Sequence, residues 1–347
     1  MKVLVTGANG QLGTDLCKVV RDFEVVPLTH KDIEVSDMSS VKQVLTRHKP
    51  DIIINTAAYV RVDDCEDEKD RAFSVNALGA RNVAVVAQEL GARLVHMSTD
   101  YVFGGEHEPT SELVGEGLVP SQNEAEGLVP SQRKPEGLVP SQRKQEGLVP
   151  SQKKPKGIVP SRKPHPYTEF DRPVPINIYG QSKLAGENLV RHFCLRHFIV
   201  RSSALFGVAG SSGKEGNFVE TMLRLAKERD ELRVVNDQVF SPTYTKDLAR
   251  KIVQLMTTEC YGIFHITNKG ACSWYEFARE ILKLAGIKTR VVAITSEQYP
   301  QKACRPRYSV LDNYHLRLLG MDDMRPWQEA LKDYLVARGY IGRQRDP

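Results

Sequence analysis

Two side chains near the middle of the chain have the types and the spacing for acid–base chemistry on a carbonyl group. Tyr179 and Lys183 are four positions apart in "YGQSK", so on a helix they project from one face. A phenol has an unperturbed pKa of about 10 and is a poor acid–base group at neutral pH. A neighbouring ammonium and a cationic nicotinamide would lower this pKa, and lowering it by about 3 units requires about 4 kcal/mol. We therefore expect Tyr179 to donate a proton to a carbonyl oxygen that receives a hydride.

Two hydroxyl groups follow an apolar run that ends in "STDYVF". Ser98 and Thr99 lie at the carboxyl end of this predicted strand, where a parallel sheet opens into a ligand crevice. A hydroxyl there can hydrogen-bond a substrate carbonyl and orient it toward Tyr179. Because Tyr-x-x-x-Lys alone is common and mostly structural, its meaning depends on a cofactor motif elsewhere in the chain.

That motif begins at residue 7. Gly7, Gly10 and Gly13 have the spacing G-x-x-G-x-x-G between a predicted strand at 2–6 and a helical apolar stripe. Gly7 allows the turn, Gly10 lets backbone N–H groups approach a pyrophosphate, and Gly13 lets the helix pack closely on the strand. In this strand–turn–helix context the motif predicts dinucleotide binding.

The end of the second predicted strand bears on the choice of nicotinamide cofactor. Where an acidic residue would bind the ribose 2′-hydroxyl of NAD, the chain reads Leu28-Thr29-His30-Lys31-Asp32. Lys31 or His30 facing a 2′-phosphate would favour NADPH, whereas both would also be ordinary as solvated loop residues. We expect NADPH, with NADH as the alternative.

The pattern around these residues alternates strand and helix. The runs "KVLVTG" and "DIIINTAA" are typical of strands buried on both faces, and helical stripes with i, i+3/i+4 spacing lie between such runs. The alternation predicts an α/β fold with a Rossmann-like doubly wound parallel sheet. Later elements, including a helix that Ser273 would cap, predict a smaller interleaved α/β substrate lobe. In that helix, Trp274, Phe277 and Ile281 form a stripe that we expect to be core.

The expected domains are discontinuous in sequence. An NAD(P)-binding Rossmann domain takes 1–105, 166–204 and 234–262, and the substrate-binding lobe takes 205–233 and 263–347. Between them, from Glu116, the unit E-G-L-V-P-S-Q recurs every ten residues. Each unit has two large apolar residues, too few to offset an ordering entropy of roughly 1–2 kcal/mol per residue. We expect 106–165 to be a disordered repeat insertion whose partner is unknown.

Composition excludes several classes of protein. The chain has 347 residues with a net charge of +5, and much of its basic character is local to the repeats, so a nucleic-acid partner is not expected. No apolar run approaches the roughly 20 residues of a membrane span, and we expect the first residues to form a strand and not a signal peptide. Six scattered cysteines without ligand spacing are typical of a reduced, cytoplasmic protein.

Together, several segments resemble one family closely. The glycine motif, "STDYVF", "PYTEFDRPVPINIYGQSKLAGE", "NFVETMLRLAKER", "DQVFSPTYTKDLA" and "ACRPRYSVL" resemble the dTDP-4-dehydrorhamnose reductases, which are extended short-chain dehydrogenases/reductases. The resemblance covers residues 1–105 and 166–335. It implies NAD(P)H-dependent reduction of the 4-keto group of a dTDP-sugar, dTDP-6-deoxy-L-lyxo-4-hexulose, to dTDP-L-rhamnose.

The resemblance also implies roles for individual residues. Tyr179 is the proton donor, Lys183 binds the nicotinamide ribose and tunes Tyr179, and Thr99 is the hydroxyl partner, with Asp100 beside it in the substrate pocket. Cofactor contacts are implied for three groups: the phosphate loop, the adenine end and the segment after the third strand. They are Gly7, Gly10, Gln11, Leu12 and Gly13; Asp37 and Met38; and Ala57, Ala58 and Tyr59.

The chain departs from the family pattern at two places. After Arg201 the family usually has "T-S-W", whose Trp lies by the sugar, whereas this chain has Ser202-Ser203-Ala204, which puts the substrate identity in question. The link that contains the repeats is normally short. Some members hold magnesium at a dimer contact, so a homodimer and Mg²⁺ stay open. Asp15 falls near one such position, but a solvated helix carboxylate is the simpler interpretation, and we assign no metal site.

Some features keep two interpretations. The acidic run 63–70 is better explained as the first turn of a helix than as a cation site. Arg305 and Arg307 suit a nucleotide diphosphate, and a surface or packing role explains them equally well. For the whole chain, an epimerase or dehydratase acting on another nucleotide sugar is one rival function. A non-catalytic role like that of the regulatory subunit of methionine adenosyltransferase is the other.

Overall fold

The fold is built on one six-stranded sheet. The computed structural model describes residues 1–20, 22–105, 165–209 and 216–342. The strands are ordered β10-β5-β4-β3-β1-β2, and every neighbouring pair is parallel. Their bounds are β1 Lys2–Thr6, β2 Glu24–Leu28, β3 Ile52–Asn55, β4 Arg93–Thr99, β5 His197–Ser202 and β10 Gly262–His265.

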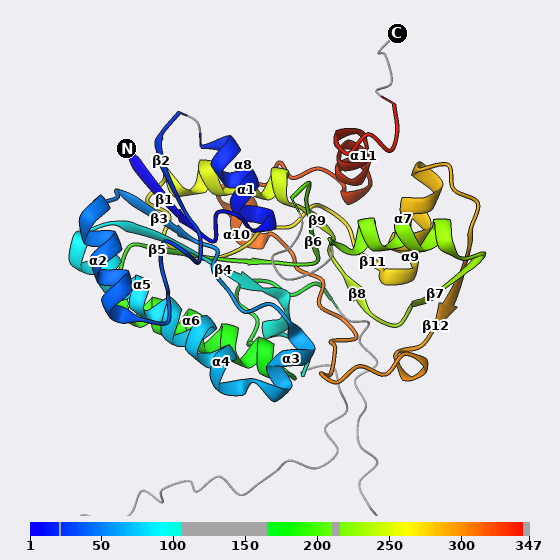
Figure 1. The fold of residues 1–347 in the computed structure, drawn as a ribbon, viewed down its shortest axis with the longest axis horizontal. Helices are drawn as coiled ribbons and strands as arrows, with labels where there is room; N and C mark the ends of the chain where they lie inside the picture. Colours follow the sequence, from blue (N-terminus) through cyan, green and yellow to red (C-terminus); the bar gives the residue numbers. More distant parts are fainter. Residues whose placement is uncertain (21, 106–164, 210–215, 343–347) are drawn as a thin grey trace, which may run out of the picture. The chain divides into compact units, whose positions relative to one another are not determined.

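Helices cover both faces of this sheet (Figure 1). Helices α1 (Gln11–Val19) and α8 (Thr245–Met256) pack on one face, and α2 (Met38–His48), α5 (Gly79–Leu90) and α6 (Ile178–Phe193) pack on the other. Successive side chains of a strand point to opposite faces, so Val3 and Val5 join the core beneath α1 and α8 while Leu4 joins the core beneath α2 and α5. The expected Rossmann-like doubly wound α/β fold is confirmed.

Short helices link β3 to α5. They are α3 (Val62–Asp67), α4 (Lys69–Phe73) and the π-helix η1 (Ser74–Leu78). Asp63 and Asp64 lie in the first turn of α3, as the acidic run predicted. Among the described residues, no group of three or more His, Cys, Asp or Glu side chains is arranged to hold a metal ion.

A second set of elements packs around its own core. Strand β7 (Glu231–Val235) pairs in parallel with β12 (Arg290–Ile294), and β8 (Val239–Phe240) pairs antiparallel with β11 (Cys272–Ser273). Helices α7 (Phe218–Glu228), α9 (Trp274–Leu284) and α11 (Trp327–Ala337) complete this core, which also holds Phe206 of β6 (Leu205–Phe206) and Tyr244 of β9 (Thr243–Tyr244). Ser273 caps α9 as predicted, because its side chain accepts from Glu276 N while Glu276 accepts from Ser273 N.

One expected boundary falls inside a strand. Because β10 pairs with β5, residues 263–265 belong with the large sheet, although the sequence placed everything after 262 in the smaller lobe. The partition into two lobes otherwise stays a prediction. The repeat insertion expected at 106–165 lies, except for residue 165, outside the described residues. No helix in the described part of the chain is long and apolar enough to cross a membrane.

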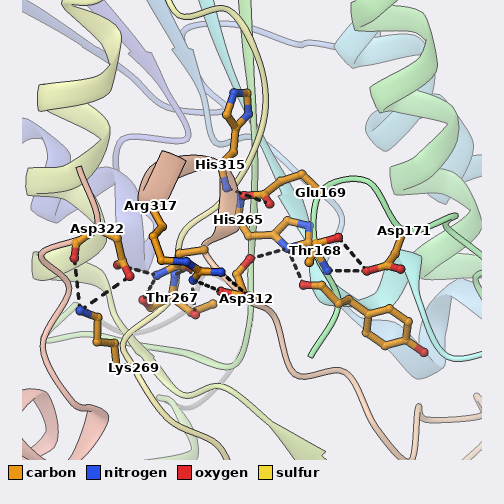
Figure 2. A network of polar contacts seen from close by, with 12 residues as sticks. Thr168, Glu169, Asp171, His265, Thr267, Lys269, Asp312, His315, Arg317 and Asp322 are labelled. Carbon is orange, nitrogen blue, oxygen red and sulfur yellow. Dashed lines mark hydrogen bonds and ion pairs between the residues drawn. The ribbon is translucent and has the colours of Figure 1, made fainter. Parts of the chain in front are cut away.

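The segment that begins at residue 165 is anchored by a polar network (Figure 2). The Tyr167 carbonyl accepts from Asp312 N at 2.8 Å and contacts His265 Nδ1 at 3.0 Å. The Glu169 carboxylate accepts from the backbone N–H groups of His265 at 2.8 Å and His315 at 3.1 Å, joining the end of β10 to the start of α10 (Tyr314–Leu318). This carboxylate therefore holds three segments together, and its burial raises the pKa of Glu169.

The two sides of the undescribed stretch are also tied to each other. Gly104 forms an antiparallel bridge with Pro175, and Gly105 N donates to Val174 O at 2.9 Å. The 3₁₀ helix η2 (Asp100–Val102) connects this point to β4, and α6 begins three residues after Pro175. The strand carrying Thr99 and the helix carrying Tyr179 are thus joined by hydrogen bonds within the described residues.

Candidate active site

A cleft of about 1700 Å³ contains nearly all of the residues selected from the sequence. It is lined by the loop after β1, the ends of β3, β4 and β5, the first turns of α6, and elements of the smaller lobe. Thirteen predicted residues line it: Gly7, Gly10, Gln11, Leu12, Gly13, Ala57, Ala58, Tyr59, Thr99, Asp100, Tyr179, Lys183 and Ala204.

Asp37 and Met38 are not among the cleft residues. Asp37 is the N-cap of α2, and its carboxylate accepts from Ser39 N at 2.9 Å and Ser40 N at 3.3 Å. The cleft wall is formed instead by residues 33–36, just before the cap. Of the two residues considered for a 2′-phosphate, His30 lines the cleft and Lys31 does not.

The glycine loop packs closely against its neighbours at two glycine positions. Gly7 has φ +66°, and a Cβ there would lie 2.8 Å from Thr56 Oγ1. At Gly13 a Cβ would lie 2.2 Å from the carbonyl oxygen of Gly7, so only glycine lets α1 start this close to β1. Gln11, at the start of α1, holds a buried Oε1 that has no hydrogen-bond partner among the described residues. These features fit a dinucleotide, whose phosphates would meet the α1 N-terminus.

Helix α6 presents Tyr179, Lys183 and Glu187 one turn apart along a single stripe. The helix start is set by Asn177, whose side chain accepts from Gly180 N at 2.8 Å and donates to Cys304 O at 2.8 Å. Lys183 is buried, and its Nζ donates to Met97 O at 2.6 Å, which fixes the ammonium at the end of β4. The cap and this bond together set how far α6 reaches into the cleft.

The electrostatics of this pair differ from the sequence expectation. Burial raises the pKa of Tyr179 well above its ordinary value; a hydrogen bond to Thr99 opposes the rise and the Asp100 charge adds to it. Burial lowers the pKa of Lys183 to about 8, against a raising effect of Glu187. The expected lowering of the Tyr179 pKa is therefore absent from the protein alone, and Tyr179 is protonated at neutral pH. That state suits a proton donor.

Behind the pair lies a buried ion pair that the sequence did not reveal. Glu187 and Arg201 are each nearly fully buried, and Arg201 Nε and Nη2 donate to the two carboxylate oxygens of Glu187 at 2.9 and 2.7 Å. Ser98 Oγ also donates to Glu187, at 2.5 Å. Ser98 is thereby committed to Glu187, and Thr99 is the hydroxyl of the two that stands beside Tyr179.

Elements that pack around the second hydrophobic core contribute an aromatic wall to the cleft, formed by Phe218, Phe240 and Trp274. The Trp274 ring lies 4.6 Å from the Phe218 ring and 4.0 Å from the Phe240 ring, measured between centroids. Phe277 and Ile281 are core, as expected, but Trp274 is half-buried and lines the cleft. Trp274 packs against this core and also forms part of the cleft lining, because it is the first residue of α9, where the helix meets the cleft.

Ala204 also lines this end of the cleft, in an unusual backbone conformation. Its φ is +43°, in the left-handed region, which costs an L-residue about 1–2 kcal/mol. It packs against the same hydrophobic cluster that contains Phe240 and Phe277. Strain of this kind persists at functional sites where the surroundings impose it. Because the Ala204 side chain is only a methyl group, the large apolar surface at this end of the cleft comes from the rings of Phe218, Phe240 and Trp274.

Arg305 and Arg307 lie in different surroundings. Arg305 lines the cleft and pairs with Asp63 at 2.8 Å, whereas Arg307 is not a lining residue.

Asp15 is buried, not solvated: Thr245 Oγ1 donates to it at 2.6 Å and Lys18 Nζ lies 3.5 Å away. The expectation of an exposed carboxylate is wrong because α8 packs over α1 and supplies this partner.

Comparison with known proteins shows the family of the chain. The family model of the RmlD substrate binding domain matches residues 1–113 and 158–339. The chain belongs to this family. Over 339 residues it is 39% identical to the spore coat polysaccharide biosynthesis protein SpsK of Bacillus subtilis, covering 97% of this chain and 98% of that protein.

Two other RmlD-family relatives have names that state an activity. A dTDP-4-keto-6-deoxy-D-glucose reductase of Streptomyces niveus is 34% identical over 332 residues, which cover 94% of each chain. The crystal structure of dTDP-4-dehydrorhamnose reductase from Bacillus anthracis, in complex with NADP, superimposes with a TM-score of 0.77 at 38% identity. It covers 97% of this chain and 99% of that one.

Proposed function

We propose that this RmlD-family protein is an NADPH-dependent oxidoreductase that reduces the 4-keto group of dTDP-4-dehydrorhamnose to give dTDP-L-rhamnose. The observation that carries the proposal is the cleft that Tyr179, Lys183 and Thr99 share with the glycine loop at residues 7–13. A hydride donor and a proton donor must reach the same carbonyl group, and a shared cleft supports such an arrangement.

Each residue has a role that follows from its position. Tyr179 holds the proton that passes to the carbonyl oxygen, and Thr99 hydrogen-bonds that oxygen and orients it. Lys183 places a buried positive charge one turn from Tyr179, where it binds the nicotinamide ribose and favours the phenolate left after proton transfer. Gly7, Gly10, Gln11, Leu12 and Gly13 hold the cofactor phosphates, while Ala57, Ala58 and Tyr59 line its path.

The cofactor supplies the hydride when bound. NADPH is favoured over NADH on two grounds: His30 lines the cleft near the expected 2′-phosphate, and the Bacillus anthracis relative is named as a complex with NADP. Asp37 and Met38 lie at the start of α2, directly after the cleft wall at 33–36, and we keep them as the residues nearest the adenine. We assign no metal ion to the reaction.

The substrate end of the cleft supports a nucleotide sugar. The aromatic wall of Phe218, Phe240 and Trp274 offers ring faces on which a pyrimidine base can stack, and Asp100 and Ala204 lie toward the reacting sugar. Ala204 also favours a second candidate, because removing a large ring beside the sugar relaxes the discrimination between 4-keto epimers. Reduction of dTDP-4-keto-6-deoxy-D-glucose, the activity named for the Streptomyces niveus relative, is that candidate.

One assay separates these functions. The purified protein is incubated with NADPH and either 4-keto epimer, oxidation of NADPH is followed by absorbance, and the product is identified by NMR. We expect stoichiometric NADPH consumption and dTDP-L-rhamnose from the L-lyxo substrate. A Tyr179→Phe variant should bind NADPH normally and lose about 10²–10⁴-fold in turnover.

Other outcomes would point elsewhere. Conversion of a nucleotide sugar without net NADPH consumption would indicate an epimerase or dehydratase. Tight NADPH binding with no turnover of either epimer would favour a non-catalytic binding role. A Tyr179→Phe variant that keeps more than a tenth of wild-type activity would refute the role of Tyr179.

A further inference from the structure

Asp100 carries a buried carboxylate next to the proposed proton donor. Its residue is 3% exposed, and its three side-chain donors are all hydroxyl groups. Ser203 Oγ and Ser309 Oγ donate to Oδ2 at 2.8 and 2.6 Å, and Thr99 Oγ1 donates to Oδ1 at 3.1 Å. No Lys or Arg in the described residues forms an ion pair with it. A buried carboxylate held by neutral donors is costly, which suggests a purpose beyond packing.

The donors come from three separate segments. Thr99 ends β4, Ser203 follows β5, and Ser309 lies between β12 and α10, next to Tyr308, which forms an isolated bridge with Val239. Ser309 is fixed in turn, because its N–H donates to Val239 O at 2.9 Å, next to Phe240 of the aromatic wall. The carboxylate therefore keeps its position only when both sides of the cleft are in place.

The Thr99 hydroxyl has a single hydrogen, and Asp100 takes it. The Thr99 oxygen then has its lone pairs free, and one accepts from Tyr101 N at 3.2 Å. Tyr179 lines the same cleft as Thr99, and a hydrogen bond donated by Thr99 would lower the pKa of Tyr179. Because the Thr99 hydrogen is on Asp100, it does not stabilise the Tyr179 phenolate, and Tyr179 keeps its own proton.

We propose that Asp100 is a positioning residue for the reduction: held by Ser203 and Ser309, its carboxylate turns the Thr99 hydrogen away from Tyr179 in the free enzyme. The bond to Thr99 is the longest of the three and hence the weakest. An entering carbonyl oxygen draws the Thr99 hydrogen to itself, while the two serines keep the carboxylate in place. Tyr179 and Thr99 then both donate to that oxygen. This inference rests on the proposed reductase function.

The charge of Asp100 acts in the same direction. Burial raises the pKa of Asp100 to about 6, against the lowering effect of Ser309, Ser203 and Thr99, so the group is ionised at neutral pH. The ionisable groups facing it are the phenols of Tyr179 and Tyr101; Arg305, whose charge acts on Tyr101, is paired with Asp63. The negative charge raises the pKa of Tyr179 and so keeps the donor protonated. Below about pH 6 the arrangement is lost.

The test is the pH dependence of turnover in the wild type and in three variants. Asp100→Asn keeps the shape and removes the charge, whereas Ser309→Ala and Ser203→Ala keep the charge and remove one donor each. For the wild type we expect kcat/KM to fall below about pH 6. Asp100→Asn should lose this acidic limb and lose about tenfold or more in kcat. Its KM for NADPH should be unchanged.

The serine variants provide the sharper discrimination. A hydroxyl donor lowers the pKa of Asp100, so its loss should move the acidic limb to higher pH in both variants. Circular dichroism and NADPH binding establish that each variant is folded. If Asp100→Asn, or both serine variants, keep wild-type turnover and an unmoved acidic limb, the role of Asp100 is refuted. The proposed function would stand in that case. A wild type that reduces neither sugar would overturn the proposed function, and this inference with it.

Discussion

Replacing Glu187 by glutamine tests how the buried ion pair behind the active site supports the catalytic helix. Glu187 lies on the same stripe of α6 as Tyr179 and Lys183, and its side chain is 1% exposed against 2% for Arg201. Arginine stays protonated in proteins, so the Glu187→Gln variant leaves a buried guanidinium without its counter-charge. The glutamine amide also turns an N–H donor toward the guanidinium where the carboxylate had an acceptor.

The expected cost in stability is large. Breaking a buried pair by neutralising one partner costs about 3–5 kcal/mol. The matched control is Glu89→Gln, which neutralises one partner of an exposed pair, Lys42–Glu89, whose N–O distance is 3.2 Å. That pair joins α2 to α5 on the same face of the sheet. An exposed pair contributes roughly 0–1 kcal/mol, so the control should unfold close to the wild-type midpoint in urea.

The variant should also change the pH dependence of activity. Glu187 raises the pKa of Lys183, which burial has lowered to about 8, so without Glu187 the pKa of Lys183 falls further. A fall of about one unit would reduce the protonated fraction at pH 7.5 about threefold. Lys183 then loses its proton at a lower pH, and the alkaline limb of kcat moves down.

Urea unfolding at fixed pH and a pH series of NADPH oxidation measure the two effects separately. If Glu187→Gln unfolds within about 1 kcal/mol of Glu89→Gln, the ion pair does not have the energetic weight given to it here. If the variant is destabilised and its alkaline limb does not move, Glu187 supports the fold without acting on Lys183.

Two further predictions concern the aromatic wall and the insertion. The chain has two tryptophans, and Trp327 is buried, so the tryptophan fluorescence of a Trp327→Phe variant comes from Trp274 alone. Binding of dTDP should quench this fluorescence. A Trp274→Leu variant should raise the KM for the sugar about tenfold without changing NADPH binding. Unchanged fluorescence on saturation with dTDP would exclude stacking on this wall. Replacing 106–164 by a short Gly/Ser linker should leave the kinetics unchanged, because the hydrogen bonds of Gly105 and Tyr167 to the rest of the fold lie within the described residues. The shorter loop should raise the free energy of unfolding by at most about 1.6 kcal/mol, since closing it costs less entropy. Lost activity with a wild-type melting temperature would instead assign the insertion a functional role.

Much of the site was predictable because its signals are local. The spacing of Gly7 and Gly13 predicts a close strand–helix turn, and both glycines have the contacts that only glycine permits. The four-residue interval between Tyr179 and Lys183 needs only a helix to bring the two side chains to one face. Thr99 needs only to end a central strand, since the carboxyl ends of parallel strands meet at one edge.

Expectations that depended on packing between elements were less accurate. Asp15 reads as an exposed helix residue until Thr245, far along the sequence, packs over it. Trp274 belongs to an apolar stripe, but its place at the start of α9 turns it to the cleft. In each case the partner or the direction is set by packing between elements, which periodicity does not encode.

The sequence by itself determined the fold class, the cofactor end of the cleft and the helix that carries Tyr179 and Lys183. These follow from hydrophobic periodicity and short motifs, which act within one element or one turn. Only the tertiary structure decided what surrounds that pair: the hydroxyls of Ser203 and Ser309 on Asp100, and Arg201 against Glu187. The physical reason is that a buried charge must be satisfied by whichever segments the sheet order and the second lobe bring beside it, and those segments are distant in sequence.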